Sequence, residues 1–454
     1  MSTKVLVPSG VLGLGFDSLA LENGLSYKPD IICIDGGSTD SGPFYLGSGT
    51  SKYARDVYKA EWRELMLARK SINVPLIIGS CGTCGVDCMV DFMYEITAEI
   101  ALELGQSIRV AQLYCNQSVN YLTQAFEAKK IIPLDPAPDI DQTKISKFSN
   151  VVALAGVEQI IEAINTGADI ILAGRSTDTA SIAALPIMNG ENIGGAWHGA
   201  KIAECGAFCS TSPTSGVVLV EFDKDGFSVE PMALDARCTP HSVSAHMLYE
   251  NADPFLLFEP GGYLNVKNAE YEATSERKVR VSGSEWEKSE KYSVKLEGVI
   301  PVGYQTVSLV IVRDERYVEN IHRWVSNLEQ FIKKKIFDIM KLPSKDYHLD
   351  FRLIGLNAVL GGLEKKENIP TEIGVQLVVT ADTQTKAAEL SKLINPFLLH
   401  HPLEEYEDYP TFAFPFSPAQ IDRGILYEFG INHVMILEDP MDCFKIKVSE
   451  MIND

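Results

Sequence analysis

The sequence has no long apolar run, no excess of basic residues and no low-complexity tract. No stretch reaches the roughly 18 apolar residues of a membrane span, and the first residues lack the apolar centre of a secretory signal. Acidic residues outnumber basic ones 61 to 40, for a formal net charge of -21. Nucleic-acid binding needs the opposite balance. We therefore expect a cytoplasmic protein that binds neither nucleic acid nor membranes.

Patterns typical of disulfide and metal sites are also missing. The nine cysteines are odd in number and scattered, which favours reduced thiols. Cys81 and Cys84 form a CxxC pair, but no second CxxC or HxxxH lies at a suitable distance. We interpret the pair as part of a glycine-rich binding loop, with a redox or metal role as the alternative. His241 and His246 are five residues apart and do not share a helical face, so we expect no metal site. The sequence does not identify a cofactor.

A chain of 454 residues is long enough for two or three domains. Its first two hundred residues alternate apolar strand patterns with helical patterns, which is typical of βαβ units. The predicted fold class is α/β, with a doubly wound, mostly parallel sheet in the N-terminal part. The expected divisions are a Rossmann-like domain, an antiparallel β-rich extension and an α+β ferredoxin-like domain, at residues 1–215, 216–305 and 306–454.

The C-terminal prediction comes from the order of the elements. A strand to Val312, a long helix from Tyr317 to Met340, two strands, a helix and a last strand near 433–437 give a βαββαβ order. Between them, the Pro-rich segment Tyr409 to Pro418 carries several aromatic residues. Exposed aromatics could line a pocket, but we favour an oligomer interface and expect a homo-oligomer.

The clearest candidate site follows the apolar run Ile170 to Ala173. The run suits a strand buried on both faces, and Gly174 to Asp178 then supplies a cation, two hydroxyls and a carboxylate. At the carboxyl end of a parallel strand the free amides of the next helix favour an anion. Arg175 is predicted to clamp it, and Asp178 to move a proton.

Other strands end in similar residues, within 35–42, 79–88 and 115–118. Because strand ends meet at one edge of an open sheet, we expect these loops to converge. Asp35 begins DGGST, which looks like an ATPase phosphate loop but lacks its hairpin; a helix N-cap is the alternative. The glycines of Ser9 to Asp17 indicate a plain turn rather than a dinucleotide site. The candidate substrate-binding residues are Asp35, Ser38, Thr39, Ser80, Cys81, Thr83, Asn116, Ser176 and Thr177.

Glu204 is a further candidate acid or base, with a solvated helical glutamate as the alternative. Beyond single residues, the chain resembles the acyclic terpene utilisation (AtuA) family. The matching segments are GADIILAGRSTDTASIAALPI, HGAKIAECGAFC, RCTPHSVSAHMLYENADPF, KVRVSGSEW, YSVKLEGV, VGYQTVSL and AFPFSP. The resemblance implies the degradation of branched isoprenoid acids through CoA thioesters. It assigns no catalytic role to any residue.

These observations favour a catabolic enzyme, a lyase or hydratase that acts on a small carboxylic acid or its CoA thioester. Arg175, Asp178 and Glu204 are its candidate catalytic residues. A hydrolase with a Ser or Cys nucleophile is an alternative, although the chain has no GxSxG elbow. Two others are a non-catalytic ligand-binding subunit of a complex and a nucleotide-dependent enzyme, the latter resting only on DGGST.

Overall fold

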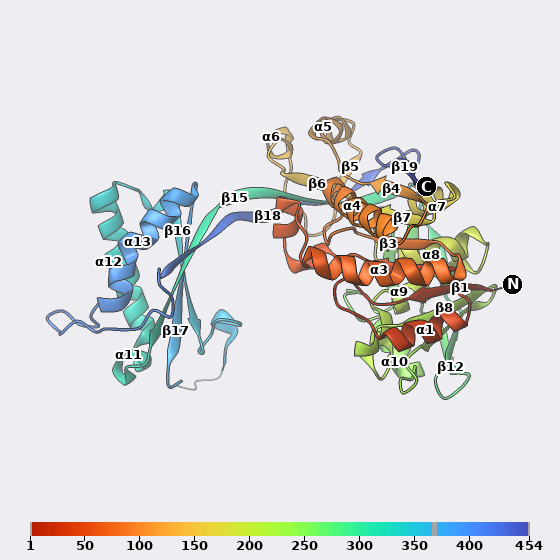
Figure 1. Cartoon of the computed structure of the whole chain (residues 1–454). Helices are drawn as coiled ribbons and strands as arrows, with labels where there is room; N and C mark the ends of the chain where they lie inside the picture. Colours follow the sequence, from red (N-terminus) through yellow and green to blue (C-terminus); the bar gives the residue numbers. More distant parts are fainter. Residues whose placement is uncertain (1, 366–369, 453–454) are drawn as a thin grey trace. The chain divides into compact units, whose positions relative to one another are not determined.

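The computed structural model describes residues 2–365 and 370–452, and the chain forms two compact units (Figure 1). The first unit extends to Ile300 and takes up the chain again from Phe429, while the second is Pro301–Glu428. Both contain helices and strands, so the α/β class is confirmed. The sequence patterns did not anticipate the return of the C-terminal segment to the first unit. The three-domain division stays a prediction.

The first unit is built around a ten-stranded mixed sheet. Its central strands are parallel and consist of short, wholly apolar or nearly apolar runs, as expected for strands covered on both faces. The antiparallel strand β8 (Val218–Asp223) joins one side of this centre, and β19 (Lys445–Met451) joins the other. The parallel strands, in sheet order, are β1 (Thr3–Val7), β2 (Ile31–Asp35), β3 (Leu76–Gly79), β7 (Ile170–Ala173) and β4 (Ile108–Tyr114).

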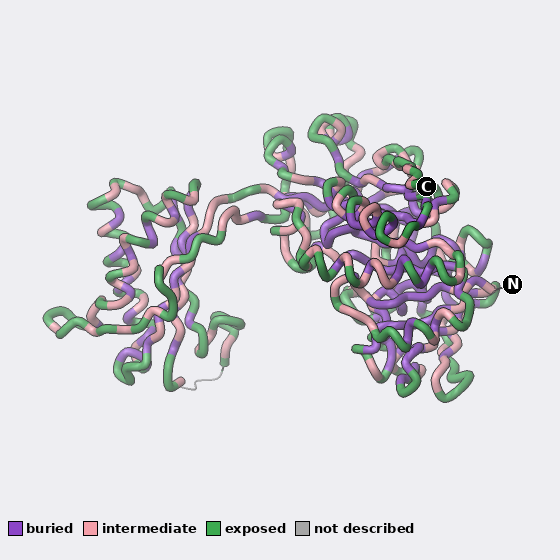
Figure 2. The backbone as a smooth tube through the Cα atoms, in the orientation of Figure 1, coloured by how far each residue is buried: buried purple, intermediate pink, exposed green. Residues whose placement is uncertain are grey.

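Helices cover both faces of this sheet, and Figure 2 shows the strands buried between them. One apolar core includes residues of α1 (Ser18–Ser26), α3 (Arg55–Ile72) and α4 (Asp87–Glu103). The core on the other face includes residues of α7 (Val157–Asn165), α8 (Ala180–Met188) and α9 (Ile193–Ala203). Further helices of this unit are α2 (Phe44–Ser48), α5 (Val119–Glu127), α6 (Gln142–Ile145) and α10 (Pro240–His246).

The antiparallel part of the first unit follows α9. A hairpin turns at Asp223–Gly226, where β8 (Val218–Asp223) and β9 (Gly226–Pro231) pair with each other. The main sheet continues through β13 (Val279–Ser282) and β12 (Glu270–Ala273), with β19 (Lys445–Met451) at its other edge. A separate three-stranded sheet consists of β10 (Leu256–Glu259), β11 (Gly262–Asn265) and β14 (Glu285–Lys288).

Two short strands of the first unit pair outside its main sheet. β5 (Ile131–Pro133) pairs with β18 (Gln420–Ile436), and β6 (Asn150–Ala153) pairs with β15 (Ser293–Val312). β15 runs without a break from one unit into the other, so the strand predicted to end at Val312 is only its C-terminal part. These partners lie more than 140 residues away in the chain, so local patterns do not reveal them.

The second unit has a single sheet with helices packed against it. Its sheet order is β16 (Tyr347–Ile354), β17 (Ile373–Ala381), β15 and β18. The core lies between this sheet and the helices α12 (Ile321–Met340) and α13 (Gln384–His400), after the short α11 (Glu315–Glu319). Buried residues on α12 recur three or four apart, which gives the helix one apolar face.

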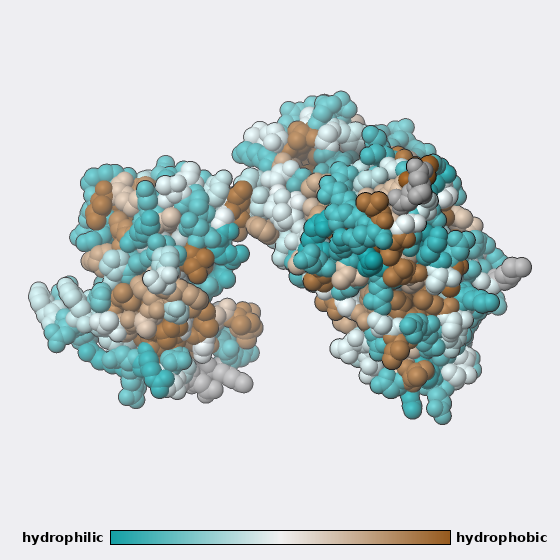
Figure 3. All heavy atoms as spheres, viewed as in Figure 1, coloured by the Kyte–Doolittle hydropathy of each residue, from teal (hydrophilic) through white to brown (hydrophobic). Residues whose placement is uncertain are grey.

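The visible surface is mainly hydrophilic, as expected for a chain without long apolar runs. On the face shown in Figure 3, hydrophilic residues predominate on both units, and hydrophobic residues form separate patches. No helix within residues 2–365 and 370–452 combines the length and apolar character that crossing a bilayer requires.

Candidate functional site

The loops after β2, β3 and β7 meet at the carboxyl ends of these adjacent strands. The Ser80 amide donates to the Gly174 carbonyl at 3.0 Å, and the Gly36 amide donates to the Gly79 carbonyl at 2.8 Å. Gly85 passes so close to Arg175 that an added Cβ would lie 2.2 Å from its backbone nitrogen, and its φ of +65° also favours glycine. The loops 35–42, 79–88 and 174–178 therefore converge, as the strand pattern predicts. The fourth predicted loop, 115–118, contacts 79–88, because Asp87 Oδ1 accepts a hydrogen bond from the Asn116 amide at 3.0 Å.

A pocket of about 530 Å³ opens beside these loops. Its lining includes five carboxyl groups, from Asp35, Asp40, Asp178, Glu204 and Glu250. Among the described residues that line it, Lys52 supplies the sole lysine or arginine cation. A second depression of about 510 Å³ shares Ser38, Asp40, Asp178 and Glu250 with this pocket and adds Arg175, Lys295 and Glu297. Carboxyl groups therefore outnumber cations in the main pocket.

Asp35, the last residue of β2, is a buried carboxyl group at the wall of the pocket. It is 8% exposed, and its Oδ2 accepts a hydrogen bond from the Gly37 amide at 2.9 Å. Its Oδ1 has no hydrogen-bond partner among the described residues. Burial, and then the charge of Asp178, raise the pKa of Asp35 well above its ordinary value. Asp35 is therefore suited to hold a proton at a pH where exposed aspartates have lost theirs.

Arg175 is held mainly by Glu297 of β15. Its Nε donates to Glu297 Oε2 at 2.9 Å, and its Nη1 donates to Ser80 Oγ at 3.0 Å. The Thr39 hydroxyl donates to the same Glu297 carboxylate at 3.0 Å. Burial alone would raise the pKa of Glu297, but the Arg175 guanidinium outweighs it and lowers that pKa. The two residues form a buried, hydrogen-bonded ion pair.

Asp178 contacts this pair from the pocket side. Its Oδ1 lies 3.4 Å from Arg175 Nη1, and its side chain keeps 32% of its surface exposed. The pKa of Asp178 is raised, first by partial burial and then by the charge of Glu297, against the opposing effect of Arg175. Asp178 thus combines access to the pocket with a raised pKa, whereas Arg175 faces largely protein groups.

The raised pKa of Asp35 predicts a pH-dependent cost to stability. Below about pH 4 the carboxyl group is protonated in both the folded and the unfolded chain. As the pH rises towards the folded pKa, only the unfolded chain ionises freely, so stability is lost. Asp35→Asn does not titrate there. We expect its melting temperature, measured against the wild type, to become relatively higher as the pH increases from 4 to 9.

Asp40→Asn is the matched control, because Asp40 lines the same pocket but is exposed. Its melting temperature should follow that of the wild type across the series. A constant difference between Asp35→Asn and wild type at every pH would contradict the raised pKa.

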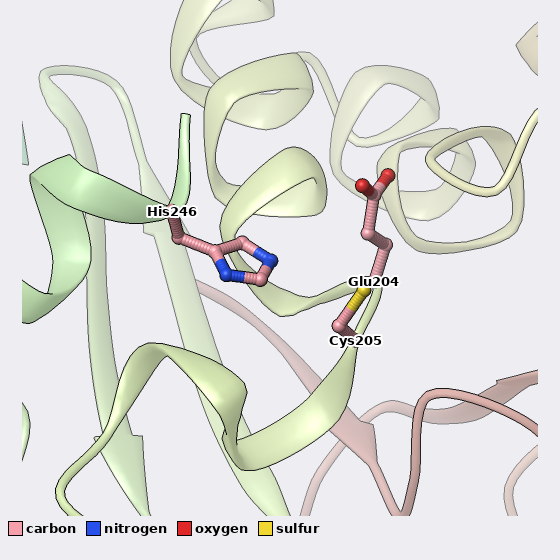
Figure 4. Close-up of side chains that lie close together, drawn as sticks. All are labelled: Glu204, Cys205 and His246. Atoms are coloured by element: carbon pink, nitrogen blue, oxygen red, sulfur yellow. The ribbon is translucent and has the colours of Figure 1, made fainter. Parts of the chain in front are cut away.

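A second charged cluster lies at the end of α9. The Lys201 ammonium donates to Glu204 Oε1, and both side chains are buried. Burial raises the pKa of Glu204 to about 8, although Lys201 opposes this shift. Cys205 follows Glu204 directly in the chain, and His246 is the last residue of α10. Potential ligand atoms of Glu204, Cys205 and His246 lie within 4.8 Å of one another (Figure 4). This trio could hold a metal ion.

Glu259, the last residue of β10, is a further, half-buried acid near the pocket. It accepts a hydrogen bond from the Thr179 hydroxyl, and burial raises its pKa to about 7. Asp178 adds to this shift. The first unit thus gathers several carboxyl groups with raised pKa values around the end of β7.

The structure places the sequence candidates in five positions. Asp35, Ser38, Thr83, Asp178 and Glu204 line the main pocket, and Thr39 and Arg175 line the adjoining depression. Ser80, Cys81 and Ser176 are fully buried behind the loops, while Thr177 lies beside Thr179. Asn116 is apart from them, in another depression with Asp87. The chemical roles of all these residues stay predictions.

Several residues of the site have no distinctive signal in the sequence. Glu297 lies in an alternating strand pattern that resembles any surface strand, and His246 follows from no ligand spacing. Tyr249 and Glu250 reach the pocket from an irregular segment after α10. The turn around Gly10 also lines the pocket. The glycines of this turn and its position after β1 could have placed it at the pocket from the sequence, because every parallel strand here ends at the same edge of the sheet.

The fold is that of an α/β protein with a pocket at the carboxyl ends of its parallel strands. The sequence model of the acyclic terpene utilisation family protein AtuA matches residues 87–411. This match spans more than half of the chain, which therefore belongs to the AtuA family, as its resemblance indicates. No curated protein and no solved structure matches the chain.

Proposed function

We propose that the protein is a catabolic enzyme of the lyase or hydratase type, acting on a small carboxylic acid or its CoA thioester. The observation that carries the proposal is the presence of Asp35 and Asp178 in one pocket, both with raised pKa values. Two carboxyl groups of this kind can serve as an acid and a base near neutral pH. Membership of the AtuA family adds a role in the use of acyclic terpenes.

Hydration of an α,β-unsaturated acyl group needs both functions. Asp178, which is ionised more readily and faces the pocket, takes a proton from water as the oxygen bonds to Cβ. Asp35, which stays protonated, donates a proton to Cα, so that one water molecule is added in total. The reverse sequence removes water. Each proton transfer by a positioned group contributes roughly 100- to 10,000-fold to a rate.

The charge distribution constrains how an acidic substrate binds. Arg175 was predicted to clamp the substrate carboxylate, but Glu297 and Ser80 engage its guanidinium. These contacts favour a role in positioning Asp178. Lys52 at the main pocket and Lys295 at the adjoining depression are the alternatives for meeting an anionic group. We propose that the substrate enters with its anionic part towards these lysines.

Proton exchange in heavy water provides a direct test. The protein is incubated with a panel of branched short-chain acids, their saturated and unsaturated CoA thioesters, and nucleotides. We expect deuterium at Cα of one class of acyl substrate, read by mass spectrometry, together with a rise in melting temperature. If nucleotides alone stabilise the protein and no acyl compound exchanges, the proposal fails.

A hydrolase with a Cys nucleophile is the second candidate, favoured by the proximity of Cys205 and His246. The electrostatics oppose it. Burial raises the pKa of Cys205, and it lowers the pKa of His246 to about 4. The pair is therefore a neutral thiol and a neutral imidazole, and the thiol is a weak nucleophile. A non-catalytic binding subunit would show the stabilisation without exchange.

The finer fold and cellular assignments belong to the same proposal. Helices on both faces of the parallel strands support a doubly wound description of the first unit. The order β16-β17-β15-β18 supports a ferredoxin-like second unit. In the Pro-rich segment, Phe412 packs on Tyr317 and Trp324, while Tyr409 and Phe416 are exposed. These exposed rings support a homo-oligomer interface. A cytoplasmic location fits the composition.

A further inference from the structure

We infer that Glu204, Cys205 and His246 form a binding site for a divalent transition metal, with Zn²⁺ as the best match. A tetrahedral zinc ion needs protein donors at about 2.0–2.3 Å, which places the donors roughly 3.3–3.8 Å apart. The candidate donor atoms already lie within 4.8 Å of one another. Small movements of three side chains therefore suffice to close the site.

The surroundings of His246 are a second, independent indication that this position binds a ligand. Its residue is 6% exposed, and Nε2 has no hydrogen-bond partner among the described residues. A buried nitrogen of this kind has lost its hydrogen bond to water without gaining another, which destabilises the folded chain. A neutral imidazole nitrogen that has no hydrogen-bond partner has a lone pair to offer a metal ion. A bound metal removes the cost of the unpaired nitrogen.

The local packing fixes the direction of the donors. The His246 ring stacks on Tyr249, with centroids 5.4 Å apart and planes inclined by 12°. Figure 4 shows the imidazole directed from α10 towards Glu204 and Cys205, which follow the end of α9. The segment after α9 and the end of α10 thus bring the three donors close to one another.

The donor set indicates the class of metal. Thiolate, imidazole and carboxylate together suit zinc rather than magnesium or calcium, which prefer oxygen alone. Lys201 holds Glu204 Oε1, so the metal is assigned to the other carboxylate oxygen. The Lys201 ammonium repels a metal cation. The carboxylates of Asp178 and Glu259, which also act electrostatically on Glu204, attract it. Metal binding also needs Cys205 to lose its proton.

Glu204 and Cys205 line the main pocket. Three protein ligands leave a fourth tetrahedral position for water or a substrate oxygen, which is the composition of catalytic rather than structural zinc sites. The metal would add positive charge to a pocket that is rich in carboxyl groups. The site itself does not depend on the proposed reaction.

Cobalt substitution is the direct test. Purified full-length protein is stripped with chelator and titrated with Co²⁺, which gives a thiolate charge-transfer band only when a cysteine is a ligand. We expect one equivalent of Co²⁺ or Zn²⁺, displacement of Co²⁺ by Zn²⁺, and loss of the band in Cys205→Ser. His246→Gln should weaken binding by about 100-fold or more. His241→Gln and Cys88→Ser change an exposed histidine and an exposed cysteine, and should bind as the wild type does.

A second readout needs no variant. Zn²⁺ should slow alkylation of Cys205 in the wild-type protein, mapped by peptide mass spectrometry, while Cys88 continues to react. Absence of the cobalt band in the wild type, or equal binding by wild type and Cys205→Ser, would overturn the inference. Metal binding without any acyl exchange would reject the proposed function and leave the metal site intact.

Discussion

Asp178→Asn is expected to lower turnover of the acyl substrate by about 100- to 10,000-fold, with little change in stability. The asparagine keeps the shape of the side chain but cannot accept a proton. Because 32% of the Asp178 side chain is exposed towards the pocket, the substitution buries no new group. Steady-state kinetics should show the loss in kcat, with KM changed far less, since the role assigned to Asp178 is proton transfer rather than binding.

Asp40→Asn is the natural comparison, since it removes a carboxylate from the lining of the same pocket. An effect on kcat confined to Asp178→Asn would support its role as the base. If both variants lose activity equally, the pocket needs its total charge rather than one proton acceptor. Full activity in Asp178→Asn, with the substrate that exchanges in the wild type, would remove Asp178 from the mechanism.

The parallel strands could be predicted from the sequence because their signal is local. The run Ile170 to Ala173 is apolar on both faces, and polar residues follow at once. The residues of this short segment therefore indicate both that the strand is buried between two helical layers and where it ends. Pairing is not local. The assignment of β5 and β6 to partners more than 140 residues away depends on β15 and β18, whose length no short window reveals.

The same distinction applies to the site. The loops after β2, β3 and β7 could be brought together from the sequence, because adjacent parallel strands end at a common edge. The ion-pair partner of Arg175 could not be predicted in this way. Glu297 lies 122 residues further along, on a strand that belongs to another sheet, and its single carboxylate resembles many others. His246 meets Glu204 and Cys205 only because α10 packs beside the end of α9.

Glu297→Gln is expected to destabilise the first unit by about 3–5 kcal/mol, the range measured when one partner of a buried ion pair is removed. Burial leaves the side chains of Arg175 and Glu297 only 7% and 9% exposed. Without the carboxylate, the guanidinium would be a buried charge with Asp178 as its remaining acidic contact. Urea unfolding followed by fluorescence and circular dichroism measures the change.

Glu372→Gln provides the comparison, because Glu372 pairs with Arg313 at the surface, where both side chains are more than half exposed. Removal of that partner should cost less than about 1 kcal/mol. A similarly small cost in Glu297→Gln would show that Arg175 has found other partners or that water reaches it. Arg175 would then be available to an anionic substrate, as first predicted from the sequence. A large cost, together with reduced kcat, would instead support its role in positioning Asp178.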